Sequence, residues 1–327
     1  MTRNFITALV LLTATLPALL PGTTAVAQEA ELDLEYAEHV PLAAHSLLLD
    51  VIRSGNRLIA AGERGHIVFS DDEGKSWQQA EAVPTRATLT KLFALDGRLW
   101  AAGHDSVILT SGDQGNTWTR QYFDPERQQP IMDLYFLNAS DGIAVGAYGL
   151  MLLTADGGQN WEDGAVNDED DAHLNAIIRL PGGTLLIAGE AGFSYRSRDG
   201  GETWESLALP YEGSMFGAVM AGDSCVLFYG LRGHVMRSCD EGDNWEELNS
   251  GSEATLLGAA GQDGEVLLAG NSGAILIYNK AGGFSVHEHS SGVDFSAVLA
   301  LGAGRYLLVG EEGLYLYPDQ ENAGGKP

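Results

Sequence analysis

The chain has 327 residues, of which 45 are Asp or Glu and 18 are Lys or Arg, so its formal net charge is −27. That balance argues against nucleic acid and anionic lipid surfaces as partners, because both are negatively charged. Hydrophobic residues make up 45% of the sequence, and a chain of this length buries roughly 75% of its unfolded surface, enough for one large core.

The N-terminus carries the features of a secretory signal. Arg3 supplies a positive charge ahead of an apolar run over residues 5–20, and Ala25 and Ala27 form a small-x-small cleavage site. We therefore expect a signal peptide at residues 1–27 and a mature chain starting at Gln28. The run is too short for a comfortable membrane span, and we expect no membrane insertion after cleavage. The mature protein is expected in the periplasm, or in a lumen if the host is photosynthetic.

One eight-residue phrase recurs five times at a nearly constant spacing. It reads Ser/Thr-x-Asp-x-Gly-x-x-Trp, and consecutive Trp residues are 41, 43, 43 and 41 positions apart. Periods of this size are typical of β-propeller blades. The Asp and Trp residues of the five copies are Asp72 and Trp77, Asp113 and Trp118, Asp156 and Trp161, Asp199 and Trp204, and Asp240 and Trp245.

This phrase is the pattern known as the Asp box, or BNR repeat, and its residues predict a tight turn. The Ser/Thr and Asp side chains accept backbone N–H bonds, and the Gly supplies positive φ. The Trp then opens the next strand and is expected to bury its ring against its own blade. The box predicts fold strongly and chemistry weakly, since a turn performs no reaction.

A strand–turn–strand unit precedes each box and occurs seven times. Its first turn glycines are Gly62, Gly103, Gly146, Gly189, Gly230, Gly270 and Gly310. With one apolar strand before the hairpin and the strand after the Trp, each repeat has four strands. The last repeat ends before its fourth strand, and the strand-like residues 32–40 are expected to complete it. The sequence thus predicts an all-β, seven-bladed propeller over residues 28–317, with an N-terminal strand closing the last blade and a flexible tail at 318–327.

Five Asp boxes, seven hairpins, an export signal and an N-terminal strand together resemble the photosystem II stability/assembly factor family. The resemblance covers about residues 30–317 and implies a seven-bladed propeller of the thylakoid lumen or, for bacterial relatives, the periplasm. It also implies a non-enzymatic assembly or stability factor that holds subunits of a membrane protein complex from that side. Photosynthetic members carry an arginine-rich patch, but no residue of this chain matches that patch. We expect a monomer without cofactor.

Two other functions remain open. One is a periplasmic accessory to an envelope transporter. The other is a sialidase-like glycoside hydrolase, since sialidases also carry Asp boxes; the nearest match to their arginine motif is Arg179-Leu180-Pro181, which lies in the fourth repeat. Sialidases have six blades, and we find no set of catalytic or metal-binding residues.

The two cysteines, Cys225 and Cys239, both lie in the fifth repeat. If Gly230 and Gly233 flank a two-residue turn, Cys225 faces Ser238, and Cys239 lies one step out of register. An oxidising compartment favours pairing, so a disulfide stays open as a possibility.

The hairpin tips vary while the Asp boxes repeat nearly unchanged. All hairpin tips should open on one face around the central channel, and all box turns on the opposite rim. Variable loops on a rigid scaffold commonly carry recognition, although weakly constrained exposed turns vary too. We expect a partner-binding face formed by Arg64, His66, His104, Asp105, Tyr148, Glu190, Arg232, His234 and Glu311.

Overall fold

The computed structural model describes residues 34–167, 171–279 and 283–318. Contacts divide the chain into Met1–Leu34 and Glu35–Pro327, and every strand lies in the second unit. The predicted signal peptide and residues 319–327 of the predicted tail lie outside the described residues. Within the described part, no helix is long and apolar enough to cross a membrane.

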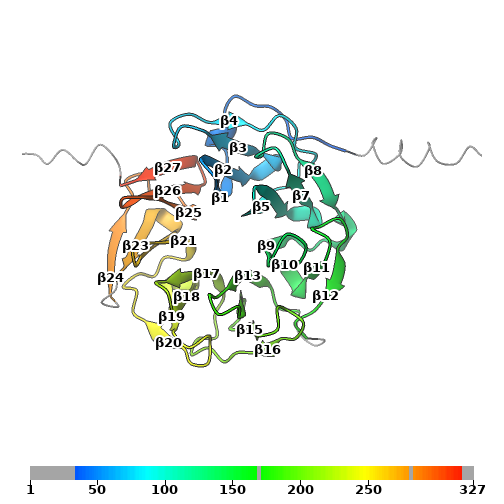
Figure 1. The fold of residues 1–327 in the computed structure, drawn as a ribbon. Helices are drawn as coiled ribbons and strands as arrows, with labels where there is room; N and C mark the ends of the chain where they lie inside the picture. The colour runs from blue at the N-terminus through cyan, green and yellow to red at the C-terminus, as the bar shows by residue number, and fades with distance from the viewer. Residues whose placement is uncertain (1–33, 168–170, 280–282, 319–327) are drawn as a thin grey trace, which may run out of the picture. The chain divides into compact units, whose positions relative to one another are not determined.

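The described residues of the second unit form seven antiparallel sheets, arranged as the blades of a propeller around a central opening (Figure 1). The innermost strand of each blade contacts those of both neighbouring blades, so the ring is closed. The fold class is therefore confirmed. Blade 1 consists of β1 Leu48–Ser54, β2 Arg57–Gly62, β3 Ile67–Ser70 and β4 Gln78–Gln79, and blade 2 consists of β5 Leu89–Leu95, β6 Arg98–Gly103, β7 Ile108–Ser111 and β8 Thr119–Tyr122. Blade 3 consists of β9 Ile131–Phe136, β10 Gly142–Gly146, β11 Met151–Thr154 and β12 Glu162–Gly164, and blade 4 consists of β13 Leu174–Arg179, β14 Leu185–Gly189, β15 Ser194–Ser197 and β16 Glu205–Ser206.

The last three blades follow the same order. Blade 5 consists of β17 Met215–Ala221, β18 Cys225–Gly230, β19 Val235–Ser238 and β20 Glu246–Leu248, and blade 6 consists of β21 Leu256–Gln262, β22 Glu265–Gly270, β23 Ala274–Tyr278 and β24 Phe284–Glu288. Blade 7 consists of β25 Phe295–Gly302, β26 Arg305–Gly310 and β27 Gly313–Tyr317. The short 3₁₀ turns are η1 Ala43–His45, η2 Glu63–Gly65, η3 His104–Ser106, η4 Pro125–Arg127, η5 Ala147–Gly149, η6 Leu231–Gly233 and η7 Asn271–Gly273.

The hydrophobic core is divided among the junctions between blades. Each of seven apolar clusters joins strands of two adjacent blades. The Asp-box Trp residues lie in these junctions: Trp118 of blade 2, for example, packs with Ile59 and Phe69 of blade 1. Each Trp was expected to pack on its own blade; the ring also packs on the preceding blade.

The box turns form through the hydrogen bonds expected of their residues. In blade 4, Ser197 Oγ donates to Asp199 Oδ1 at 2.8 Å and accepts from the Gly201 amide at 2.8 Å. Asp199 also accepts from the amide and the hydroxyl of Thr203, at 2.9 and 2.5 Å. The other four boxes repeat this arrangement.

The expectation that residues 32–40 form the fourth strand of the last blade is wrong for residues 34–40. They form no strand, and β27 is the outermost strand of the seventh sheet in the described chain. The segment lies against blade 1 instead: the Ala37 amide donates to Val83 O at 2.9 Å, and the Val40 amide donates to Gln79 Oε1 at 3.1 Å. The alternation of apolar and polar residues predicts that this segment is extended, but it does not predict which sheet edge the segment lies against.

A disulfide joins Cys225 and Cys239. Because Val226 pairs with Ser238, Cys225 lies directly opposite Cys239, one step from the register expected from sequence. The error came from the turn: the Gly230 amide donates to His234 O at 3.1 Å, so the connection is longer than two residues.

Candidate functional site

The hairpin tips are attached to the innermost strand of their own blade. In every blade the amide of the first tip residue donates to the carbonyl just before that strand, at 2.9–3.0 Å. The donors are Glu63, His104, Ala147, Glu190, Leu231, Asn271 and Glu311. The turn glycines allow this approach: a Cβ at Gly62 would lie 2.0 Å from Leu47 O. The tips therefore surround one end of the channel.

The residues predicted for a binding face divide by exposure. Most are exposed at the tips, namely Arg64, His104, Asp105, Tyr148, Arg232 and Glu311, and Glu190 and His234 are half-buried. The second tip residue in blades 1 to 6 has positive φ, between 51° and 58°, which turns its side chain outward. His66 differs from the set because it is only 4% exposed and its Nδ1 lies 3.1 Å from Ser46 Oγ.

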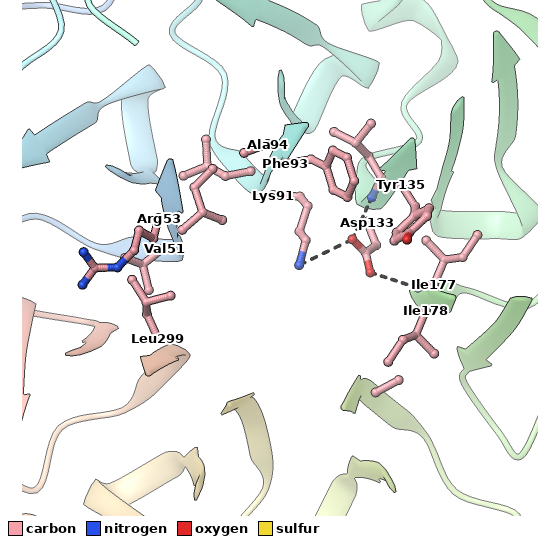
Figure 2. Close-up of a pocket in the computed structure, with 14 residues that line it drawn as sticks. Val51, Arg53, Lys91, Phe93, Ala94, Asp133, Tyr135, Ile177, Ile178 and Leu299 are labelled. Atoms are coloured by element: carbon pink, nitrogen blue, oxygen red, sulfur yellow. Dashed lines mark hydrogen bonds and ion pairs between the residues drawn. The ribbon is translucent and has the colours of Figure 1, made fainter. Parts of the chain in front are cut away.

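The sequence predictions missed a charged cluster in the channel wall. Lys91 on β5 lies between two carboxylates, with Nζ 3.6 Å from Asp50 Oδ2 and 3.5 Å from Asp133 Oδ1. Figure 2 shows the Lys91 side chain pointing into the channel towards Asp133. The three residues occupy the same position of the innermost strand in blades 1, 2 and 3, and a charge inside an apolar strand was the available sequence signal.

Each carboxylate also joins its blade to the next. Asp50 accepts from the Val51 amide at 2.9 Å and from the Leu92 amide of blade 2 at 2.8 Å. Asp133 likewise accepts from the amides of Leu134, at 2.7 Å, and of Ile177 in blade 4, at 2.9 Å. These bonds orient both carboxylates towards Lys91.

The environment fixes the charge of this cluster. Burial acts to lower the pKa of Lys91, but the adjacent Asp133 and Asp50 outweigh it and raise that pKa. Burial also raises the pKa of the Tyr229 hydroxyl, which lies in the same wall. Lys91 therefore stays an ammonium at physiological pH and is not a proton acceptor.

A cavity of about 520 Å³ occupies this part of the channel. Its wall includes Lys91, Tyr229 and Asn175, together with apolar groups such as Phe216. A second cavity of about 410 Å³ is lined by Lys91, Arg53 and Phe93 (Figure 2). Within the described residues, no group of three or more His, Cys, Asp or Glu side chains has a metal-binding arrangement.

The charged groups of the box rim are largely bonded to one another. Arg57 pairs with Asp71 at 2.7 Å and donates to Asn116 Oδ1 of blade 2 at 2.9 Å. Arg196 pairs with Glu205 and with Asp243 of blade 5, both at 2.7 Å. Among the described residues, by contrast, no hydrogen bond or ion pair engages the side chains of His104, Asp105 or Arg232 at the tips.

Comparison with known proteins gives one family and several similar folds. A family profile described as photosynthesis system II assembly factor YCF48 matches residues 120–292. A solved structure described as YCF48 bound to D1 peptide is 18% identical with a TM-score of 0.69, covering 87% of this chain and 95% of that one. YCF48 from Cyanidioschyzon merolae is 16% identical with a TM-score of 0.67, covering 86% and 97%.

An ancestral GH74 enzyme also has a similar fold, at 14% identity and a TM-score of 0.67, with 86% of this chain and 46% of that chain covered. No curated protein matches the chain. At these identities the solved structures establish a common fold only.

Proposed function

We propose that this chain, which belongs to the photosynthesis system II assembly factor YCF48 family, is an exported, non-enzymatic factor that binds a subunit of a membrane protein complex. The partner docks on the face formed by the hairpin tips around the channel. The box rim serves the propeller itself.

One observation carries this proposal, namely the difference between the two ends of the ring. At the box rim, guanidinium groups pair with carboxylates of their own blade, and Arg196 also pairs with Asp243 of the next blade. At the tips, the backbone is fixed by the same bond in all seven blades, while exposed side chains differ from blade to blade. A rigid frame that carries variable, exposed side chains is suited to recognition.

The kind of partner follows from the family. The YCF48 protein of one similar structure is described as bound to a D1 peptide, so a polypeptide segment is the expected ligand class here too. Export rests on the signal features of residues 1–27, and the disulfide is consistent with an oxidising compartment. Binding rather than catalysis fits the channel, where Lys91 is held as a cation by two bonded carboxylates.

The test is capture of the native partner from detergent-solubilised membranes of the source organism, quantified by mass spectrometry. The variant Arg64→Ala/Tyr148→Ala/Arg232→Ala removes exposed tip side chains from three blades. We expect it to lose most of the partner captured by the wild type, with a melting temperature nearly unchanged, because these side chains contribute little to packing.

The matched control changes three exposed residues of the opposite rim, Lys75→Ala, Glu202→Ala and Asp223→Ala. Asn116 is left intact because it accepts a hydrogen bond from Arg57. If the rim variant loses the partner and the tip variant keeps it, the docking face is the wrong one. Recovery of transporter subunits alone would favour the transporter accessory role.

A further inference from the structure

Aromatic side chains gather on the tip face of blades 3 to 5. The Tyr148 ring meets His173 edge-on, with centroids 4.7 Å apart, and the Tyr211 ring stacks on His234 at 3.7 Å. Between these pairs lies Phe193, just after the tip of blade 4. We call Tyr148, His173, Phe193, Tyr211 and His234 the aromatic arc.

Backbone contacts hold the arc together across the three blades. Glu190 links His173 to the tip of blade 4, because its amide donates to His173 O and its Oε1 accepts from the His173 amide, both at 3.0 Å. The same tip meets the loop that carries Tyr211, since the Gly192 amide donates to Gly213 O at 3.1 Å. These bonds therefore fix the segments that carry the rings relative to one another.

Two members of the arc expose far more apolar surface than packing requires. Tyr148 is 58% exposed and Phe193 is 40% exposed. Large apolar side chains scattered singly are normal on protein surfaces, but a cluster across adjacent elements marks a contact site. The stacked rings also present π-faces and edges, which favour planar or cationic groups.

Carboxylates border the arc. The Glu247 Oε1 atom lies 2.6 Å from His234 Nδ1, and Glu190 and Glu247 keep 38% and 46% of their side chains exposed. Glu212 is exposed beside Tyr211. Against these three carboxylates, the tips of blades 3 to 5 carry one arginine or lysine, Arg232. The arc is therefore negative as well as aromatic.

From this geometry we propose that the aromatic arc binds an extended, arginine- or lysine-bearing polypeptide segment of the partner. Guanidinium or ammonium groups lie over the rings of Tyr148 and Phe193 and pair with Glu190 and Glu212. An extended segment fits because the contacts span three successive blades. The inference rests on the proposed function and adds the chemistry of the partner segment and the sector of the ring that receives it.

The test uses two fluorescently labelled synthetic peptides of equal length, one arginine-rich and one with glutamate in place of every arginine. Affinity is measured by fluorescence anisotropy at several salt concentrations. We expect the arginine peptide to bind, with affinity falling as salt rises, and the glutamate peptide to bind at least about tenfold more weakly.

Two variants address the two components of the arc. Tyr148→Leu/Phe193→Leu keeps apolar volume but removes the rings, and should weaken arginine-peptide binding about tenfold. Glu190→Gln/Glu212→Gln should weaken binding and flatten its salt dependence. Glu202→Gln/Asp223→Asn, which neutralises two exposed carboxylates on the opposite rim, should leave peptide affinity unchanged. Melting temperatures establish that each variant is folded.

Equal affinity for both peptides, or unchanged affinity in both arc variants, would overturn the inference. Partner capture with Phe193→Leu/Glu212→Gln separates this failure from failure of the proposed function. If that variant retains the membrane partner while Arg64→Ala/Arg232→Ala, which keeps all five residues of the arc, loses it, the tip face binds but the arc does not receive a basic segment. If neither variant affects capture, the proposed function itself fails.

Discussion

The two halves of the channel wall join neighbouring blades by different means. In blades 1 to 4 the innermost strands are linked by polar side chains: besides the two carboxylates, Thr90 Oγ1 donates to Ile131 O at 2.6 Å, and Asn175 Nδ2 donates to Met215 O at 2.9 Å. In blades 5 to 7 the position of Asp50, Lys91 and Asp133 is taken by Gly217, Gly258 and Ala297. At Gly258 the innermost strand lies close to the backbone of the next blade, and Gly217 is covered by the ring of Tyr229.

This difference shows that one repeat can close a ring in two ways. Polar links fix the position of adjacent strands because each buried carboxylate must keep its hydrogen bonds. Glycine and alanine instead allow direct backbone contact: a Cβ at Gly258 would lie 2.6 Å from the Ala297 Cα. The first half should be sensitive to loss of charge, and the second to added volume.

The largest decrease in the free energy of unfolding is expected from Lys91→Met. The change removes the cation between Asp50 and Asp133, which are 8% and 6% exposed, and leaves two carboxylates facing one another. Breaking a buried ion pair costs about 3 kcal/mol, measurable as a lower free energy of unfolding in urea. Adding Asp50→Asn and Asp133→Asn removes the opposed charges but leaves each side chain one acceptor oxygen for two backbone amides, so it should restore only part of the loss. An unchanged unfolding midpoint in Lys91→Met would show that the charges are solvated by the channel.

Gly258→Ala tests the other half of the wall. The new methyl group meets backbone rather than a flexible side chain, so the strands must separate, at a cost of about 2 kcal/mol by analogy with overpacked cores. Thermal unfolding provides the measurement. Gly112→Ala is the control, because a Cβ there meets nothing within 4 Å. Equal melting temperatures for the two variants would mean that the wall of blades 5 to 7 is loosely packed.

Much of this architecture is readable from the sequence because it repeats. The spacing of the Trp residues and turn glycines predicts the number of blades, and Ser197 and Asp199 predict their turn from local chemistry alone. The register of Cys225 was missed by one step because the length of a turn depends on its backbone conformation. The position of residues 34–40 was missed because the local sequence pattern does not determine which blade an extended segment packs against.

The candidate site was predictable only in part. The tips could be recognised from the glycine pattern, so Arg64, Tyr148 and Arg232 were correctly placed at the tips, while their role in binding stays a prediction. Lys91 could have been noticed as a charge within an apolar strand. The aromatic arc could not be predicted, because Phe193 and Tyr211 belong to different segments, which are joined by hydrogen bonds from the Ala191 and Gly192 amides to Ser214 and Gly213.

The smallest effect is expected on folding stability at low pH, where the Asp-box carboxylates become protonated. The sequence confines the Asp boxes to blades 1 to 5. The hydrogen bond from the Thr203 hydroxyl, with that from its amide, lowers the pKa of Asp199 from 3.8 to about 2. Between these values the unfolded chain binds the proton and the folded chain does not, so the stability from this carboxylate is complete above pH 4 and is lost as pH falls towards 2. Asp199→Asn should therefore unfold with a shallower pH dependence than the wild type over this window, whereas Asp223→Asn, at an exposed position, should follow the wild type. Urea unfolding at a series of pH values measures the slopes.

Hydrogen exchange at pH 3 compares the blades directly. We expect the box turns of blades 1 to 5 to lose protection before blade 6, because the fourth strand of blade 6 forms without a box. Equal loss in all blades would mean that acid acts through the charge of the whole chain and that the boxes do not distinguish the two parts of the ring.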